Sequence, residues 1–221
     1  MKSSLLLPLL FLCQLTLAQT KSIGVFDNHV DIGNPKIKGD VTYKKSTKTY
    51  LLTGAGYNIW FARDEFQFLY KELTGDFTLT ANFEFIGAGK DPHRKIGWMV
   101  RESLADTAVH VSAVSHGDGL VVMQWRTAAG AAMRDPQDEI FFAEKFLPQV
   151  IQMERVGQKL TMRVGNPGEA LKTVGSYESN LPDAVLGGVY ICSHNPEVAE
   201  QARVWNVKID RPRSVGSATK K

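Results

Sequence analysis

Several side chains of this sequence have the chemistry to hold a sugar against the face of a β-sheet. A sugar ring offers an apolar C–H face that suits aromatic rings, and a rim of hydroxyl groups that suits planar Arg and Gln side chains. Strand alternation in residues 120–126 places Gln124 and Arg126 on one face and Trp125 on the other. The predicted carbohydrate-binding groove contains Arg101, Gln124, Arg126 and Gln152, and is bordered by Trp60 and Tyr57.

Arg101 decides whether this groove is open to solvent. In residues 96–101 it lies on the face opposite Trp98, so it points onto the sheet surface if the Trp98 face is core. It could instead pair with Glu154, or with a strand beside Glu102. Such exposed ion pairs contribute little to stability.

Trp60 and two histidines also have structural interpretations. Residues 60–68 contain four large aromatic side chains, and this cluster could place Trp60 in the core instead of beside a ligand. His110, on a predicted strand, is expected to be a hydrogen-bonded structural histidine. His116 is expected to be a turn residue, because Gly117, Asp118 and Gly119 follow it.

The motifs that would mark a catalytic centre are missing from the sequence. No Glu-x-Asp run occurs, although two carboxylates at that spacing share a strand face and can divide nucleophile and acid roles. Glu84, Glu102 and Glu154 are isolated within their segments, but two of them could still meet across a sheet. There is no Gly-x-Ser-x-Gly, and Cys192 is expected to be a buried structural thiol.

Metal-binding patterns are equally weak. The five histidines show no His-x-His or Glu-x-x-His spacing, so a zinc site is not expected. Asp27 with Asp31, or Asp91 with Asp118, could join a Ca²⁺ site through loop carbonyls, but their spacing does not require one. No cofactor is therefore expected.

The elements that must position these residues are short strands separated by turns. Residues 76–85 alternate almost perfectly between apolar and polar positions. Residues 136–146, the best helical candidate, are expected to form a loop with a turn or two. Many short strands without a convincing helix predict an all-β, antiparallel two-sheet β-sandwich. The predicted strands are residues 48–53, 76–85, 96–101, 108–115, 120–126, 150–155, 160–164, 185–192 and 203–209.

Composition excludes several classes of protein. With 43% hydrophobic and 22% charged residues, the chain has the make-up of a globular domain, not of collagen or a disordered segment. Two cysteines in 221 residues do not make a disulfide scaffold. The net charge is +3 and the basic residues do not gather into a stripe, so nucleic acid is not an expected partner.

The N-terminal residues have the features of a signal peptide. Lys2 precedes an apolar run over residues 5–17, and Ala18 offers a small residue for cleavage. We therefore expect a signal peptide at 1–18, one β-sandwich domain at 19–210 and a flexible basic tail at 211–221. This predicts an exported protein, periplasmic or extracellular, with no membrane span after cleavage.

Eight blocks of the sequence resemble the concanavalin A-like superfamily, in particular the laminin-G-like modules appended to bacterial glycoside hydrolases and cell-surface proteins. The resemblance implies a concanavalin A-like jelly roll. It is specific for the fold but not for an activity, because the superfamily holds lectins, glucanases, lyases and passive linkers. The blocks are residues 31–33, 50–56, 59–60, 64–68, 73–77, 96–103, 187–195 and 205–207.

Three functions from different classes follow from these observations. The first is a secreted carbohydrate-binding module that recognises a poly- or oligosaccharide on a sheet face. The second is a glycan-active hydrolase or lyase whose acid and base meet across the sheet. The third is a non-catalytic module that docks an envelope protein partner.

Overall fold

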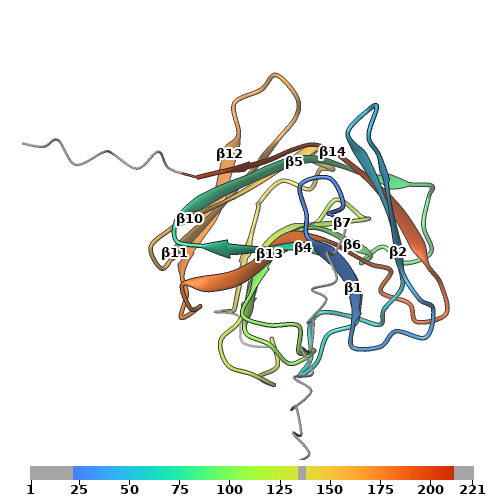
Figure 1. The fold of residues 1–221 in the computed structure, drawn as a ribbon, viewed down its shortest axis with the longest axis horizontal. Helices are drawn as coiled ribbons and strands as arrows, with labels where there is room; N and C mark the ends of the chain where they lie inside the picture. The colour runs from blue at the N-terminus through green and yellow to red at the C-terminus, as the bar shows by residue number, and fades with distance from the viewer. Residues whose placement is uncertain (1–21, 134–137, 212–221) are drawn as a thin grey trace, which may run out of the picture.

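The computed structural model describes residues 22–133 and 138–211, which form fourteen strands and no α-helix. The strands make two antiparallel seven-stranded sheets that lie face to face (Figure 1). Among the described residues, no helix is long and apolar enough to cross a membrane. The predicted signal peptide and the tail beyond residue 211 lie outside the described residues.

The first sheet carries the predicted groove residues of strands β6 and β8, and we call it the site sheet. Each strand pairs antiparallel with its neighbours. In spatial order its strands are β1 (Asn28–Ile32), β4 (Phe66–Thr74), β13 (Ala184–Cys192), β6 (Lys95–Arg101), β7 (His110–His116), β8 (Val121–Arg126) and β9 (Glu139–Phe141).

The second sheet packs against one face of the site sheet, and we call it the backing sheet. The chain crosses between the sheets repeatedly, so neighbours in space are often distant in sequence. In spatial order its strands are β12 (Lys172–Glu178), β11 (Lys159–Gly165), β10 (Val150–Val156), β5 (Phe77–Ile86), β14 (Glu200–Asp210), β3 (Thr49–Gly54) and β2 (Asp40–Lys44).

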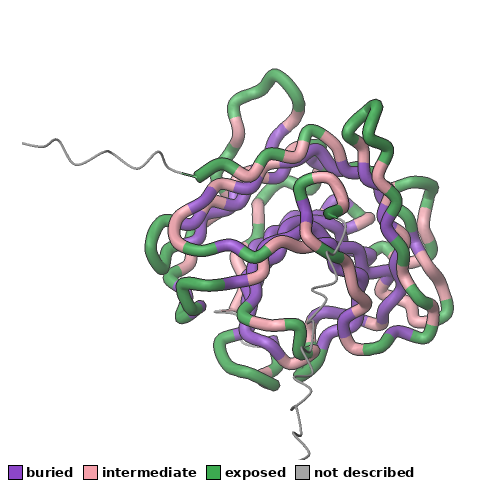
Figure 2. Tube along the Cα trace, in the orientation of Figure 1, coloured by how far each residue is buried: buried purple, intermediate pink, exposed green. Residues whose placement is uncertain are grey.

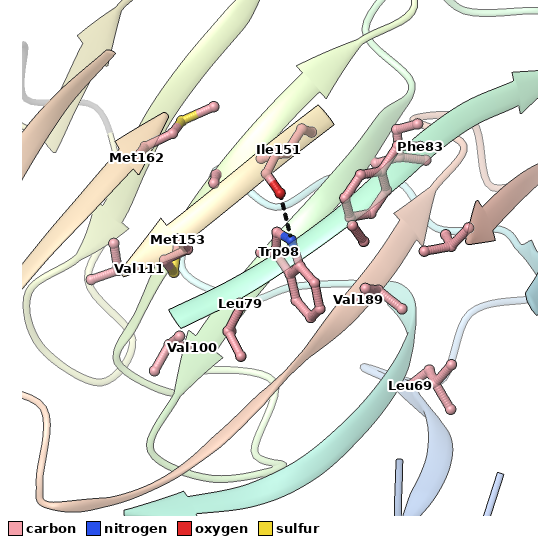
Figure 3. Close-up of a cluster of buried hydrophobic side chains, with 14 of the residues drawn as sticks. Leu69, Leu79, Phe83, Trp98, Val100, Val111, Ile151, Met153, Met162 and Val189 are labelled. Carbon is pink, nitrogen blue, oxygen red and sulfur yellow. Dashed lines mark hydrogen bonds between the residues drawn. The ribbon is translucent and has the colours of Figure 1, made fainter. Parts of the chain in front are cut away.

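Alternating apolar side chains from both sheets form the core between them. Leu79 and Phe83 of β5 meet Trp98 of β6 and Val189 of β13 in one buried cluster (Figure 3). Trp98 is completely buried, and its indole Nε1 donates a hydrogen bond of 3.0 Å to the carbonyl oxygen of Ile151 in the opposite sheet. The Trp98 face of β6 is therefore core, and Arg101 lies on the opposite, outer face.

The fold class and all nine predicted strands are confirmed, with boundaries within a few residues. Strands β1, β2, β4, β9 and β12 were not predicted. In β4 the first four residues are buried on both faces, so no two-residue alternation marks them as a strand. The segment 136–146, expected to be a loop, contains the three-residue strand β9.

Burial follows the strands of the sandwich. Buried residues run along the central strands, whereas exposed residues gather in the turns (Figure 2). In β6, β7 and β8 every residue is buried, on the face away from the core as well as on the core face. Something other than the backing sheet therefore covers the outer face of these three strands.

We expect Trp98→Ala to lower the free energy of unfolding by about 3–5 kcal/mol, because it empties a core site and removes the bond to Ile151. Val156→Ala, at a position that is 57% exposed, should change it by less than about 0.5 kcal/mol. Urea denaturation of both variants checks this. Equal effects would contradict the assignment of Trp98 to the core.

Candidate functional site

The outer face of the site sheet brings together three of the predicted groove residues. Arg101 of β6 is paired with His110 of β7, which is paired with Arg126 of β8. Gln124 lies two residues along β8 from Arg126 and therefore on the same face. The predicted shared face of Arg101, Gln124 and Arg126 is confirmed.

Arg126 is covered by three loops, and its guanidinium group bonds to each of them. Its Nη2 donates to the carbonyl of Phe61 at 2.8 Å, in the loop before β4. Its Nη1 donates to the carbonyl of Ala108 at 3.1 Å, in the loop before β7. Its Nε donates to the carbonyl of Ala131 at 2.8 Å, in the segment after β8. The guanidinium thus holds the three loops down on the sheet.

Asp64 supplies the charge that allows Arg126 to be buried. Its carboxylate receives two hydrogen bonds from Arg126, one of them 2.8 Å from Nη1 to Oδ2. Arg101 Nη2 lies 3.6 Å from the same Oδ2, and Arg101 also donates to the carbonyl of Ser103 at 2.7 Å. All three side chains are fully buried, so this cluster is a paired ionic network inside the molecule.

The exposure expected for Arg101 is therefore wrong, because loops fold over this end of the sheet. Neither Glu154 nor a strand beside Glu102 takes its charge; Asp64 does. Replacing Arg101 would remove one of the two cations beside a buried carboxylate, so its loss would test folding before it tested ligand binding. Carbohydrate contact by Arg101 and Arg126 stays a prediction.

Two other predicted residues do not belong to the strands of this face. Gln152 is in β10 of the backing sheet, where its Nε2 donates to Thr80 Oγ1 at 3.1 Å. It does not continue the groove, because the chain has crossed to the other sheet after β9. Tyr57 lies in the loop before β4, stacked on Phe61, with its hydroxyl donating to the carbonyl of Arg63 at 2.8 Å.

The outer face of the site sheet stays open at its other end, where it forms a pocket of about 270 Å³ that we call the sheet-face pocket. Trp60 and Gln124 are the predicted residues that reach it. Phe141 of β9, which is 55% exposed, supplies a second aromatic wall. The lining residues are Asn58, Trp60, His93, Lys95, His116, Leu120, Val122, Gln124, Glu139, Phe141 and His194.

Hydrogen bonds to the sheet hold the loop that carries Trp60. Gln124 Nε2 donates to the carbonyl of Ile59 at 3.1 Å, and Lys95 Nζ donates to Asn58 Oδ1 at 3.1 Å. The carbonyl of Trp60 itself accepts from the backbone N–H of Met133 at 2.9 Å. Gln124 therefore positions the Trp60 wall.

The pocket lining contains four ionisable groups with perturbed pKa values, one of which is His194, whose pKa is lowered by burial. Burial and the adjacent charge of Lys95 lower the pKa of His116 to about 3, so its ring is neutral at pH 7. Burial raises the pKa of Glu139 to about 7. Burial also lowers the pKa of Lys95. Ionisable groups with perturbed pKa values are concentrated at functional sites.

Sequence reasoning missed Lys95, His116 and Glu139. His116 is the last residue of β7, not a turn residue, and it continues the alternation of His110, Ser112 and Val114 onto the outer face. That alternation was the available signal. The pairing of Lys95 with His116 across β6 and β7 comes from the register, which the sequence does not display.

His110 also departs from its expected role. It is fully buried beside Arg101 and Arg126, but both of its ring nitrogens lack a hydrogen-bond partner within the described residues. Burial, and then the charges of the two arginines, hold its pKa well below the usual value. The ring is therefore neutral between its two cationic neighbours.

The aspartates considered for Ca²⁺ have protein partners. Asp27 accepts a hydrogen bond from Lys71, and Asp31 accepts one from Gln67. Asp118 accepts one from the backbone of Leu120. The described residues contain no group of three or more His, Cys, Asp or Glu side chains that could hold a metal ion.

Comparisons with known proteins give likeness in fold only. No protein-family model matches the chain, and no curated protein sequence matches it. A functionally unknown protein from Saccharomyces cerevisiae superposes with a TM-score of 0.63 at 16% identity, covering 83% of this chain and 96% of that one.

Two alginate lyases are also similar in structure. AlgAT5, from Polysaccharide Lyase family 7, has a TM-score of 0.51 at 7% identity, covering 77% of this chain and 81% of its own. AlyC3 in complex with dimannuronate has a TM-score of 0.50 at 10% identity, covering 82% of this chain and 88% of its own. The chain therefore has the concanavalin A-like β-sandwich fold, which glycan-active enzymes also use.

We expect Asp64→Asn to lower the free energy of unfolding by about 3–5 kcal/mol, because Arg126 and Arg101 would keep their burial but lose their counter-charge. Glu197→Gln is the matched control, since it breaks the solvent-exposed pair with Lys36 and should cost less than about 1 kcal/mol. Urea denaturation measures both. A small effect at Asp64 would mean that the network does not hold the loops.

His116 should make the protein sensitive to acid. Its pKa is about 3 in the folded state and near the usual value when unfolded, so the unfolded chain binds a proton first as pH falls. We expect the wild type to lose about 1.4 kcal/mol per pH unit relative to His116→Asn between pH 6 and pH 4. Asn keeps a donor for the carbonyl of Leu120, which His116 Nδ1 now reaches at 3.1 Å. Parallel pH profiles of unfolding would contradict the buried neutral ring.

Proposed function

We propose that this chain binds an oligosaccharide in the sheet-face pocket. The observation that carries the proposal is the convergence of two aromatic walls, Trp60 and Phe141, with the polar groups of Lys95, Gln124 and Glu139 on the open end of one sheet face. An aromatic ring can cover the apolar face of a sugar while polar side chains reach its hydroxyls. The size of the pocket suits one or two sugar rings of a longer chain.

Fold likeness supports a carbohydrate ligand without specifying its use. The alginate lyases described above carry the same sandwich, and the name of one records a bound dimannuronate. The proposed setting, periplasmic or extracellular, depends on the signal peptide expected at residues 1–18. An envelope protein remains the alternative partner.

A glycan-active enzyme at the same pocket is the second candidate, favoured by the state of its ionisable groups. His116 is neutral at pH 7, and its Nδ1 donates to the carbonyl of Leu120, so its Nε2 carries a lone pair. Glu139, with a pKa of about 7, can hold or release a proton at neutral pH. Together they have the properties of a general base and a general acid.

A thermal-shift screen of the protein against a panel of oligosaccharides tests the proposal, because a ligand that binds only the folded state raises the melting temperature of the protein. We expect Trp60→Ala to weaken the binding of any hit by about tenfold or more, measured by calorimetry. Val156→Ala, on a strand of the other sheet, should bind like the wild type.

The same samples separate a binder from an enzyme. New reducing ends or unsaturated products, lost in His116→Asn and Glu139→Gln, would establish catalysis. Binding without products would establish a binding module. No melting shift across the panel would overturn the proposal and favour a protein partner. Full binding by Trp60→Ala would overturn the sheet-face pocket as the binding site.

A further inference from the structure

Lys95 is a buried cation that forms no ion pair within the described part of the chain. Only 4% of the residue is exposed. Its ammonium group donates to two neutral acceptors, Asn58 Oδ1 at 3.1 Å and the carbonyl of His93 at 3.2 Å. An ammonium group has three N–H donors, so one of them has no acceptor among the described residues.

Other buried cations of this protein are satisfied differently. Arg94 Nη1 lies 2.8 Å from Glu200, and Arg126 is paired with Asp64. Arg155, near the end of β10, donates to four backbone carbonyls, three of which belong to the loop before β13. Lys95 has neither a carboxylate nor a full set of acceptors, although burying an ammonium group is costly unless its charge is compensated.

The unused donor belongs to the lining of the sheet-face pocket. Lys95 and both of its acceptor residues, Asn58 and His93, line that pocket. Trp60 and Phe141 are part of the same lining, so a sugar ring held between them lies within the same 270 Å³ as the ammonium group. A ligand bound in this pocket would therefore lie next to Lys95.

The ionisable groups around Lys95 have other partners or carry little charge, and none of the described ones pairs with it directly. Asp91 accepts a hydrogen bond of 2.7 Å from the backbone N–H of His93, and its carboxylate lies 3.1 Å from His194 Nδ1. His116 is neutral, and burial raises the pKa of the Cys192 thiol to about 11, so that group is neutral as well. Glu139, with a pKa of about 7, is only partly charged at neutral pH. Within the described residues, none of these groups forms an ion pair with the Lys95 ammonium group.

We propose that the oligosaccharide bound in this pocket contains a uronic acid, and that its carboxylate accepts a hydrogen bond from Lys95 Nζ. This inference rests on the proposed function and adds the charge of the ligand to it. A carboxylate supplies both the missing acceptor and the missing counter-charge, and charge-assisted hydrogen bonds of this kind are about twice as strong as neutral ones. A hydroxyl group of a neutral sugar would supply only the acceptor.

Calorimetry with an oligouronate and with its carboxyl-reduced, neutral counterpart tests this inference. We expect the wild type to bind the oligouronate about tenfold more tightly, with a preference that shrinks as NaCl is added. Lys95→Met should bind both ligands with the same affinity. Lys208→Met is the matched control, because it removes an exposed charge from β14 of the backing sheet and should keep the preference.

Glu139→Gln gives an independent check that leaves Lys95 in place. Glu139 gains its full negative charge above pH 7 and should then repel the ligand carboxylate. We expect the preference of Glu139→Gln for the oligouronate over the neutral ligand to be several-fold larger than that of the wild type at pH 8.

The outcomes separate this inference from the proposed function. Equal binding of the charged and neutral ligands by the wild type, or a preference retained by Lys95→Met, would overturn the uronic acid while leaving oligosaccharide binding intact. Binding of neither ligand, together with an unresponsive sugar panel, would overturn the proposed function itself. An unchanged circular dichroism spectrum shows that Lys95→Met is folded, so that a lost preference for the charged ligand reports on the missing ammonium group.

Discussion

Burial of the Arg126 guanidinium is the constraint on which the outer face of the site sheet depends. A charge removed from water must be paired and its donors satisfied, or the cost reaches several kcal/mol. Asp64 provides the charge, and carbonyls from three separate loops provide the remaining acceptors. The loops are thereby drawn onto the sheet, and one end of the face becomes interior. Arg101 joins the network through the same carboxylate.

The loop that covers one end of the outer face also forms part of the pocket at the other end. The loop that carries Asp64 also carries Asn58 and Trp60, and it is attached to the sheet by Lys95 and Gln124. The loop that carries Trp60 is thus held both by the ionic network and by side chains that line the pocket. The pocket that Trp60 lines is open, yet burial is still the largest cause of the pKa shifts of its ionisable groups.

The β-sandwich fold by itself does not indicate whether the protein binds a ligand or catalyses a reaction. The same fold holds alginate lyases and a protein of unknown function, so the choice lies in the side chains of one face. Here the face offers a neutral imidazole at His116, a proton-holding carboxyl at Glu139 and an incompletely paired ammonium at Lys95. Glycoside hydrolases usually place two carboxylates around the scissile bond, whereas Glu139 is the one carboxylate among the described residues that line this pocket.

The sequence by itself determined the sandwich and the shared face of Arg101 and Arg126, because side chains alternate with a period of two in any strand. It did not determine that Gln152 belongs to the other sheet, since alternation is the same in both sheets. Nor did it reveal that Lys95 meets His116, which depends on strand register. Tertiary structure also decided which end of the face is covered. Loop sequences have no regular alternation that would predict their position, and here three loops are held where their carbonyls bond the buried Arg126.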